Sequence, residues 1–255
     1  ILTLQMRGGY YCARCGKFFS ANDIAALRER SVVRESAETL VNLAPTESVF
    51  AKLDGATATI SAVNGNNISC GTAWFINYNN YNKYLVTNYH VIENSNSVSA
   101  KFSKNIDPRC ENYSAKVVAT DEANDLALIQ LDADLGNMDV LSGRTSLKIA
   151  NIDNVKVGDE VCTLGNPRGI RLVLTRGSIS GIGYGDYGFN KTSGYNRFLV
   201  DITSTNGSSG GAVCNGRGEV VGIITQGCDE LPHQAACVSC LAIQQLMSVY
   251  YKKNK

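Results

Sequence analysis

The sequence predicts an all-β fold, and three observations support this prediction. After about residue 55, short runs of alternating or β-branched residues recur, and clusters of Gly, Asn and Asp separate them. Many short strands with regular turn signals are typical of a β-sandwich or a β-barrel rather than of alternating strands and helices. About a dozen runs suit two barrels of six strands each. The predicted strands cover residues 56–63, 71–76, 83–87, 97–102, 115–120, 126–131, 159–164, 171–182, 197–202, 211–214, 219–225 and 236–241.

The chain is predicted to close on a helix over residues 242–251, and a lysine-rich end follows it. Lysines suit the negative end of a helix dipole. We divide the chain into an N-terminal extension, residues 1–47, and a β domain, residues 48–255. The extension is predicted to be short and α-helical.

In the extension, Cys12 and Cys15 have the spacing of a zinc knuckle or of a dithiol. A closed structural zinc site normally takes four protein ligands. The second pair at this spacing, Cys237 and Cys240, lies in the predicted last strand, where residues three apart point to opposite faces. We do not expect that pair to bind one metal. A zinc ion at Cys12 and Cys15, a disulfide and two free thiols all remain open interpretations.

The predicted helix of the extension covers residues 21–44, which contain neither Gly nor Pro, and Pro45 ends it. Ser20 and Asp23 resemble a capping box at its start. Such an amphipathic helix would either pack on the β domain or provide a contact for a partner or for self-association. Its apolar face would consist of Ile24, Leu27, Val33, Ala37, Leu40 and Val41.

The composition is that of a globular protein with enough chain for a substantial core. The 24 basic and 23 acidic residues nearly cancel, so neither a nucleic-acid patch nor attraction to a membrane surface is expected. No apolar run approaches the roughly 20 residues that span a bilayer. Cys162 and Cys214 lie in apolar strands and are predicted to be buried thiols.

The most informative segment is residues 205–213, in which Ser209 lies between glycines at the start of a run of small and β-branched residues. A tight turn there can expose the Ser209 hydroxyl and point backbone N–H groups into one small hole. A serine hydroxyl is a poor nucleophile unless a base removes its proton and donors hold the oxyanion formed by its attack. The rest of the chain must therefore supply a base.

Only two histidines are available, and His90 has the better setting, because a β-branched strand runs into a polar turn there. His233 follows Pro232 in a polar segment and has no such setting. Asp125 stands at the entrance of an apolar strand. These residues are too far apart to meet locally, so a fold must unite His90, Asp125 and Ser209.

Together these stretches resemble a trypsin-like serine protease of the HtrA or DegP-like type. The resemblance runs in unbroken order from about residue 48 to about residue 250. It implies a chymotrypsin-like fold of two antiparallel six-stranded β-barrels, with the catalytic residues between them. The matching stretches are residues 71–76, 86–92, 124–129, 157–160, 164–169, 175–181, 207–213 and 218–223.

The resemblance implies a serine endopeptidase that acts on a protein or peptide and needs no cofactor for catalysis. Ser209 would be the nucleophile, His90 the general base and Asp125 the residue that fixes the imidazole tautomer. The N–H groups of Gly207 and Ser209 would form the oxyanion hole. Gly207 matters because a β-carbon would penalise the conformation needed there.

The resemblance places Thr203 at the floor of the primary specificity pocket and Ile224, Thr225 and Gln226 in its wall. Since none of them is a carboxylate, we expect cleavage after small or medium aliphatic residues rather than after Arg or Lys. Ser208 stands where digestive relatives have an acid that pairs with a new N-terminus. Activation through such an N-terminus is therefore not expected.

HtrA-type proteins usually carry a PDZ module after the protease, and the sequence leaves no room for one, so we expect a protease domain alone. A protein of another class remains as the alternative: a catalytically silent scaffold that keeps the fold and binds a partner through its N-terminal extension. The intact Ser209, His90, Asp125 and Gly207 favour the enzyme.

Overall fold

The computed structural model describes two compact units, Ile1–Leu43 and Ala44–Lys255. Side chains are described from Val49 onward within the ranges below. The described backbone comprises residues 2–6, 9–12, 18–20, 46–78, 83–132, 144–166, 173–182, 196–227, 231 and 233–253.

The first unit contains a three-stranded antiparallel sheet in the order β1-β2-β3. Its strands are β1 (Leu2–Met6), β2 (Gly9–Cys12) and β3 (Phe18–Ser20). These strands were not predicted from the sequence, where only a cysteine pair and a helix were expected. The predicted helix over residues 21–44 and the side chains of Cys12 and Cys15 lie outside the described part of the chain.

The first barrel of the second unit closes because β5 pairs with both β4 and β6. The sheet order is β10-β5-β4-β7-β8-β9-β6, with β10 outside the ring and parallel to β5. The strands are β4 (Thr57–Asn64), β5 (Asn67–Asn77), β6 (Tyr84–Thr87), β7 (Ser97–Lys101), β8 (Tyr113–Asp121), β9 (Leu126–Leu131) and β10 (Leu147–Lys148).

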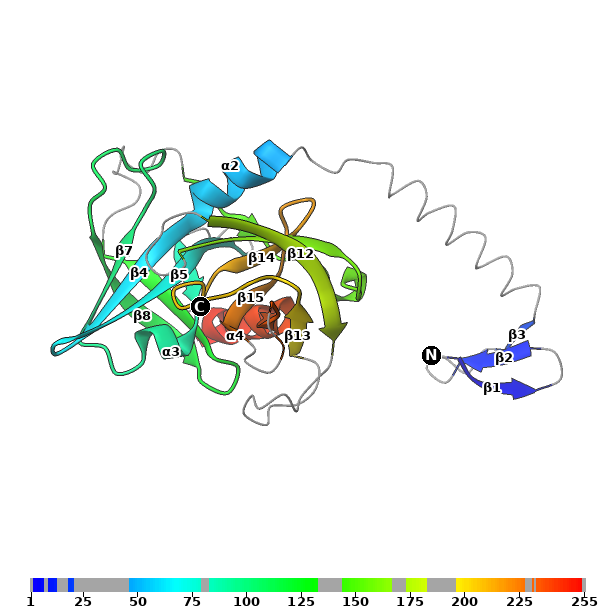
Figure 1. Cartoon of the computed structure of the whole chain (residues 1–255). Coiled ribbons are helices and arrows are strands. Elements are labelled where there is room, and N and C mark those ends of the chain that lie inside the picture. Colours follow the sequence, from blue (N-terminus) through cyan, green and yellow to red (C-terminus); the bar gives the residue numbers. More distant parts are fainter. Residues whose placement is uncertain are drawn as a thin grey trace. The chain divides into compact units, whose positions relative to one another are not determined.

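The second barrel is also closed and antiparallel, in the order β11-β12-β13-β16-β15-β14 (Figure 1). Its strands are β11 (Glu160–Gly165), β12 (Val173–Ile182), β13 (Arg197–Val200), β14 (Ala212–Asn215), β15 (Val220–Gly227) and β16 (Ala235–Ser239). Each predicted strand overlaps one strand of the two barrels. The predicted fold of two six-stranded barrels is therefore confirmed.

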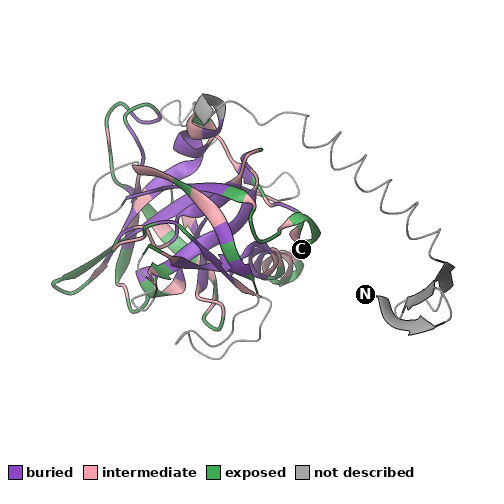
Figure 2. Cartoon of the chain, turned by 45° about the vertical axis from the view of Figure 1, so that its right-hand side comes forward, coloured by how far each residue is buried: buried purple, intermediate pink, exposed green. Residues whose placement is uncertain are grey.

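Strand β5 supplies two different cores, because successive side chains on a strand point to opposite faces. Ala73 and Phe75 point into the first barrel, whereas Trp74 and Ile76 join a core shared with the second barrel. The second half of β5 is therefore buried on both faces, as are β6, β9 and β16, whereas β7, β8 and β12 keep exposed residues, drawn green in Figure 2. Burial on both faces explains why the sequences of β6 and β9 are largely apolar.

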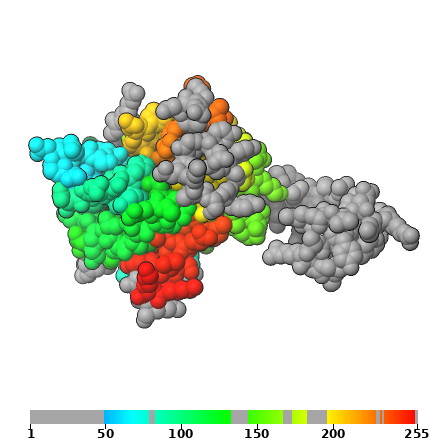
Figure 3. All heavy atoms as spheres, turned by 90° about the horizontal axis from the view of Figure 1, so that it is seen from below, coloured from blue at the N-terminus to red at the C-terminus, as the bar shows by residue number. Residues whose placement is uncertain are grey.

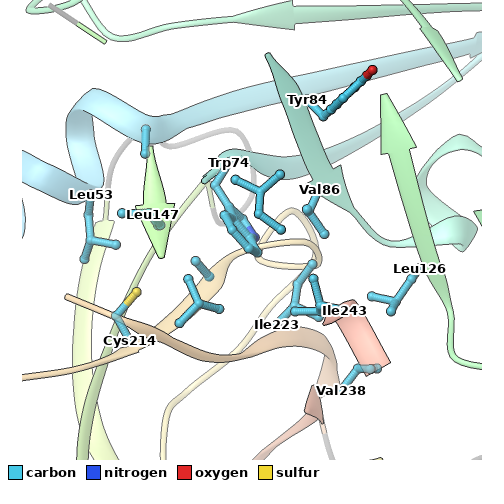
Figure 4. Close-up of a cluster of buried hydrophobic side chains, with 14 of the residues drawn as sticks. Leu53, Trp74, Tyr84, Val86, Leu126, Leu147, Cys214, Ile223, Val238 and Ile243 are labelled. Atoms are coloured by element: carbon cyan, nitrogen blue, oxygen red, sulfur yellow. The ribbon is translucent and has the colours of Figure 1, made fainter. Parts of the chain in front are cut away.

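The shared core joins the barrels to each other and to the C-terminal helix. Trp74 is fully buried in the middle of this cluster, near Leu147, Val86 and Ile223 (Figure 4). An aromatic side chain of this size buries about 150–250 Å², so it contributes strongly to holding the barrels together. The interior of the second barrel forms a third, separate cluster around Phe198.

Two helices cover this arrangement. Helix α2 (Thr46–Ala56) leads directly into β4, and Val49, Leu53 and Ala56 place it on the shared core (Figure 1). This helix was not predicted. The two compact units divide after Leu43, so α2 belongs to the second unit.

The second covering helix, α4 (Cys240–Lys253), confirms the predicted C-terminal helix, and it contacts β15 and β16 of the second barrel and β8 of the first (Figure 3). Tyr250 of α4 packs edge-on against Tyr84 of β6. The expectation that Cys240 lies in the last strand is wrong, because β16 ends at Ser239 and Cys240 begins α4. Among the described helices, none is long and apolar enough to cross a membrane.

Candidate active site

His90 and Asp125 are far apart in the sequence but lie at adjacent ends of two paired strands. β6 ends at Thr87, which is opposite Ala127 in β9. The residue that precedes β9 therefore faces the residues that follow β6. The one-turn helix α3 (Tyr89–Ile92) begins there and carries His90. Pairing of two buried strands thus brings the imidazole to the carboxylate.

Asp125 holds His90 by two hydrogen bonds. Asp125 Oδ2 lies 2.8 Å from His90 Nδ1, and Oδ1 accepts the backbone N–H of His90 at 2.9 Å. An ionised carboxylate only accepts hydrogen bonds, so Nδ1 carries the proton and Nε2 is left as the basic nitrogen. The His90 side chain is 44% exposed and that of Asp125 is 17% exposed. The base is reachable from solvent while its carboxylate partner is largely covered.

The backbone of Asp125 is fixed as firmly as its side chain. Its φ is 55°, a left-handed conformation that Asp and Asn tolerate better than most residues. Asn88 Nδ2 donates to the Asp125 carbonyl oxygen at 2.9 Å. Beside it, both the backbone N–H and the side-chain amide of Asn124 donate to Asp121. The turn therefore presents the Asp125 carboxylate in one orientation.

Ser209 lies in the loop between β13 and β14 of the second barrel. Ser208 N–H donates to the Thr205 carbonyl at 2.9 Å, and Gly207 has a φ of 96°. A bonded turn with a positive φ at its third residue is a type II turn, which favours glycine there. Gly210 also has a positive φ, and a β-carbon on it would overlap the Thr72 carbonyl oxygen. Gly207 is thus favoured by the turn of the loop, and Gly210 is required both by its positive φ and by the close approach of β5.

Thr225 connects the two halves of the site. Its hydroxyl donates to Asp125 Oδ2, and its carbonyl oxygen accepts the Ser209 hydroxyl at 3.1 Å. Within the described residues, the Ser209 hydroxyl makes this bond and none to His90. The backbone N–H groups of Gly207 and Ser209 have no hydrogen-bond partner in the same part of the chain. They remain available for an acceptor that comes from outside.

A small hollow lies beside the nucleophile loop. Two of the four predicted substrate-binding residues, Thr203 and Ile224, line it, whereas Thr225 and Gln226 do not. The side chain of Thr225 is instead engaged with Asp125. None of the described residues that line the hollow is charged. Its walls include Thr163, Gly165, Thr203, Ser204, Ser208 and Ile224.

Arg197, the first residue of β13, is a cation whose charge interacts with that of Asp125. Burial lowers the pKa of Arg197, whereas Coulombic attraction to Asp125 acts in the opposite direction and raises this pKa. As for metals, no three His, Cys, Asp or Glu side chains in the described ranges are grouped to hold one.

The family model for the trypsin-like peptidase domain matches residues 71–223, which is more than half of the chain. The chain belongs to the trypsin-like peptidase family. Over 142 residues it is 39% identical to a probable serine protease do-like of Buchnera aphidicola and 33% identical to the periplasmic serine endoprotease DegP of Escherichia coli. The aligned part is 56% of this chain and 27% of each relative, so the chain matches about a quarter of their length.

Solved structures show the same fold for this trypsin-like peptidase. The HtrA-type protease AlgW with a tripeptide superposes with a TM-score of 0.67 at 20% identity, over 83% of this chain and 65% of AlgW. The active form of the Rv3671c protease from M. tuberculosis gives 0.65 at 19% identity, over 78% of this chain and 82% of that one. The predicted resemblance to DegP-like proteases is confirmed at the level of family and fold.

Sequence reasoning named His90, Asp125, Ser209 and Gly207, and the structure places them around one site. It did not identify two residues that contact them: Asn88, which donates to the Asp125 carbonyl, and Thr72, whose N–H donates to the Ser209 carbonyl at 2.8 Å. Asn88 stands two residues before His90, and this closeness to the predicted base could have marked it as part of the site. Thr72 lies in the matching stretch 71–76, but nothing in that stretch indicated a contact with the Ser209 loop.

Proposed function

We propose that this trypsin-like peptidase is a serine endopeptidase that works through an acyl-enzyme. Ser209 Oγ attacks the scissile carbonyl while His90 Nε2 accepts its proton and later gives it to the leaving amine. Asp125 keeps the proton on Nδ1 and stabilises the imidazolium. The observation that carries the proposal is the pair of hydrogen bonds that joins Asp125 to His90. Through Thr225, Asp125 is also linked to the Ser209 hydroxyl.

Attack requires the Ser209 hydroxyl to turn from the Thr225 carbonyl towards His90 Nε2. Rotation about one side-chain torsion moves an oxygen between staggered positions without any change of backbone. Catalytic hydrogen bonds are often loose in free enzymes and tighten only with substrate. The Thr225 carbonyl therefore serves as a resting acceptor for the nucleophile.

For the oxyanion, we propose the backbone N–H groups of Gly207 and Ser209 as donors. Two observations support them. Neither donor has a partner within the described residues, and the turn at Gly207 is closed by the hydrogen bond from the Ser208 N–H to the Thr205 carbonyl. A preorganised donor of this kind contributes roughly 3 kcal/mol to the transition state.

For specificity, we propose cleavage after small or medium aliphatic residues. The uncharged hollow lined by Thr203 and Ile224 supports this, because it offers no carboxylate to an Arg or Lys side chain. Thr225 and Gln226 would contribute through the wall of the substrate groove. A peptide-library profile dominated by basic residues at the cleaved position would contradict the proposal.

The same library tests the activity itself. Wild-type chain is incubated with the peptides, new termini are mapped by mass spectrometry, and Ser209→Ala serves as the matched control. We expect cleavage by the wild type and none by the variant. If neither cleaves any peptide, the endopeptidase proposal fails and the scaffold alternative gains support.

For the N-terminal extension, we propose a zinc ion held with the help of Cys12 and Cys15, and a partner or self-association contact through residues 21–44. The cysteine spacing and the apolar face of the predicted helix support these proposals. The self-association contact is tested by comparing the sedimentation of the full chain with that of a variant in which Leu27 and Leu40 are changed to Glu. Identical sedimentation of the two would contradict self-association.

A further inference from the structure

Thr72 contacts the nucleophile loop from the opposite barrel. It lies in β5 of the first barrel, the barrel that carries His90 and Asp125, and it is fully buried. Its backbone N–H donates to the Ser209 carbonyl oxygen at 2.8 Å. Its hydroxyl donates to the Gly207 carbonyl oxygen, also at 2.8 Å. One residue thus holds the two carbonyls that flank the Ser208–Ser209 peptide.

The direction of the hydroxyl bond is fixed by its other neighbours. The backbone N–H and the side-chain amide of Asn166 approach Thr72 Oγ1 at 3.2 and 3.3 Å, and both are donors. A threonine hydroxyl has one proton, so that proton is left for the Gly207 carbonyl. Asn166 is itself buried and follows β11 of the second barrel. The hydroxyl therefore lies in a closed network between the barrels.

This network fixes the peptide that follows Gly207 at both ends. Its carbonyl accepts from Thr72, and its N–H, that of Ser208, donates to Thr205. Because a peptide unit is planar, two opposed hydrogen bonds define its plane. The Gly207 N–H is attached to the same α-carbon, so its direction depends on that plane. The Ser208 carbonyl is also engaged, by the N–H of Gly211.

We infer that Thr72 is a positioning residue for the proposed reaction. Its amide and its hydroxyl hold the Gly207 and Ser209 carbonyls against the first barrel, and thereby set the nucleophile and the oxyanion donors relative to His90. Thr72 touches no reacting atom. Its effect is exerted through the loop, and the inference rests on the proposed endopeptidase function.

The test compares Thr72→Val, which keeps the shape and removes the hydroxyl, with Thr72→Ser, which keeps the hydroxyl. Thr145→Val is the matched control, because the Thr145 hydroxyl donates to the Lys52 carbonyl in the same way but outside the site. A misplacement of about 1 Å can cost about 100-fold. We expect kcat on a cleaved library peptide to fall about 10- to 100-fold in Thr72→Val with KM little changed.

Thr72→Ser should recover most of the rate, and Thr145→Val should keep kcat. A Thr72→Val enzyme with wild-type kcat, or a Thr72→Ser enzyme as slow as Thr72→Val, would overturn the inference. If Thr72→Val does not fold, Thr72→Cys replaces it, since a thiol is a weak donor of similar size, and an intermediate kcat is expected.

Amide hydrogen exchange of peptides covering residues 203–213 provides a readout that needs no turnover. Gly210 N–H donates to the Ile224 carbonyl and Gly211 N–H to that of Ser208, so both report on the loop. Loss of the Thr72 hydroxyl should speed their exchange about tenfold, and Thr72→Ser should not. Unchanged exchange in Thr72→Val would overturn the inference. Faster exchange in a chain that cleaves nothing would show that the Thr72 hydroxyl holds the loop, while contradicting the endopeptidase proposal and with it a role of Thr72 in that reaction.

Discussion

The two barrels contribute to the site in different ways. In the first barrel, His90 and Asp125 are held by bonds within that barrel: the β6–β9 pairing, the Asn88 amide and the two bonds between the pair. In the second barrel, the Ser209 loop has its own turn bonds, but Thr72 of the first barrel holds two of its carbonyls. The base is thus assembled locally, and the nucleophile is positioned across the interface.

This difference separates two kinds of substitution. A change within the pair of His90 and Asp125 should act on proton transfer and leave the packing of the barrels alone. A change at the interface should act on the distance and orientation of Ser209 relative to the base. The following experiments are ordered from the largest expected effect to the smallest.

The largest effect is expected for Asp125→Asn. An amide at this position would present a donor to His90 Nδ1 and favour the tautomer whose Nε2 carries the proton. That nitrogen could no longer accept the Ser209 proton, so kcat should fall about 10,000-fold. Steady-state kinetics on a cleaved peptide measure the loss, and the exposed Asp153→Asn serves as the control. A fall in kcat of less than about tenfold would contradict the proposal that Asp125 keeps His90 in the tautomer that accepts the Ser209 proton.

A smaller effect is expected for Thr225→Val. Thr225 belongs to the second barrel, and its hydroxyl donates to the Asp125 carboxylate of the first barrel. It is therefore the one described contact, among those discussed above, through which the second barrel supports the pair of His90 and Asp125. Hydrogen bonds to charged groups contribute about 1.5–3 kcal/mol. We expect kcat to fall about tenfold or more, with recovery in Thr225→Ser. Equal kcat in wild type and Thr225→Val would show that the pair needs no support from the second barrel.

The sequence was sufficient for the parts of this site that follow from local patterns. Alternating apolar runs gave the barrel strands, and the turn around Ser209 required the glycines that reveal it. On the other side of the contact between the barrels, Thr72 showed no such pattern: it is a β-branched strand residue like many others, and its role appears only when β5 lies beside the Ser209 loop. Helix α2 was missed because its apolar face, Val49, Leu53 and Ala56, is short and gains its stability from the shared core.

The interface can also be weakened without touching the site. Trp74 lies in the shared core and Phe75, its neighbour on β5, lies inside the first barrel. Either change to Ala should lower the free energy of unfolding by about 3–5 kcal/mol. At a temperature where both variants are folded, only Trp74→Ala should lower kcat, by a few-fold, because it loosens the contact between barrels. Denaturant unfolding and kinetics at that temperature measure the two quantities.

Equal loss of kcat in Trp74→Ala and Phe75→Ala would mean that activity follows stability alone. The division of β5 between two cores would then have no functional consequence. Loss of kcat in Phe75→Ala only would place the sensitive contact inside the first barrel and contradict the comparison.

The smallest effect concerns stability at alkaline pH. Burial raises the pKa of the Cys240 thiol from its ordinary 9.0 to about 11. Above pH 9 the unfolded chain loses this proton while the folded chain keeps it, so the folded state loses stability as pH rises towards 11. The free energy of unfolding should fall by up to about 2 kcal/mol more in wild type than in Cys240→Ala. Parallel curves for the two would contradict burial of the thiol at the start of α4.

The metal content of the N-terminal extension is tested without reference to the barrels. The purified chain is analysed by plasma mass spectrometry beside Cys12→Ser. If Cys12 and Cys15 help to bind zinc, the wild type should contain close to one zinc per chain and the variant much less. Zinc-free wild type would leave a disulfide or free thiols as the interpretation.

The central claim is that folding brings the Ser209 hydroxyl, the His90 imidazole and the Asp125 carboxylate into one working unit. A fluorophosphonate probe tests it directly, because it reacts with activated serines. We expect tandem mass spectrometry to find the adduct on Ser209 in the wild type, with labelling at least about 100-fold slower in His90→Ala. No adduct on the wild type, or an adduct that forms equally fast without His90, would contradict the account.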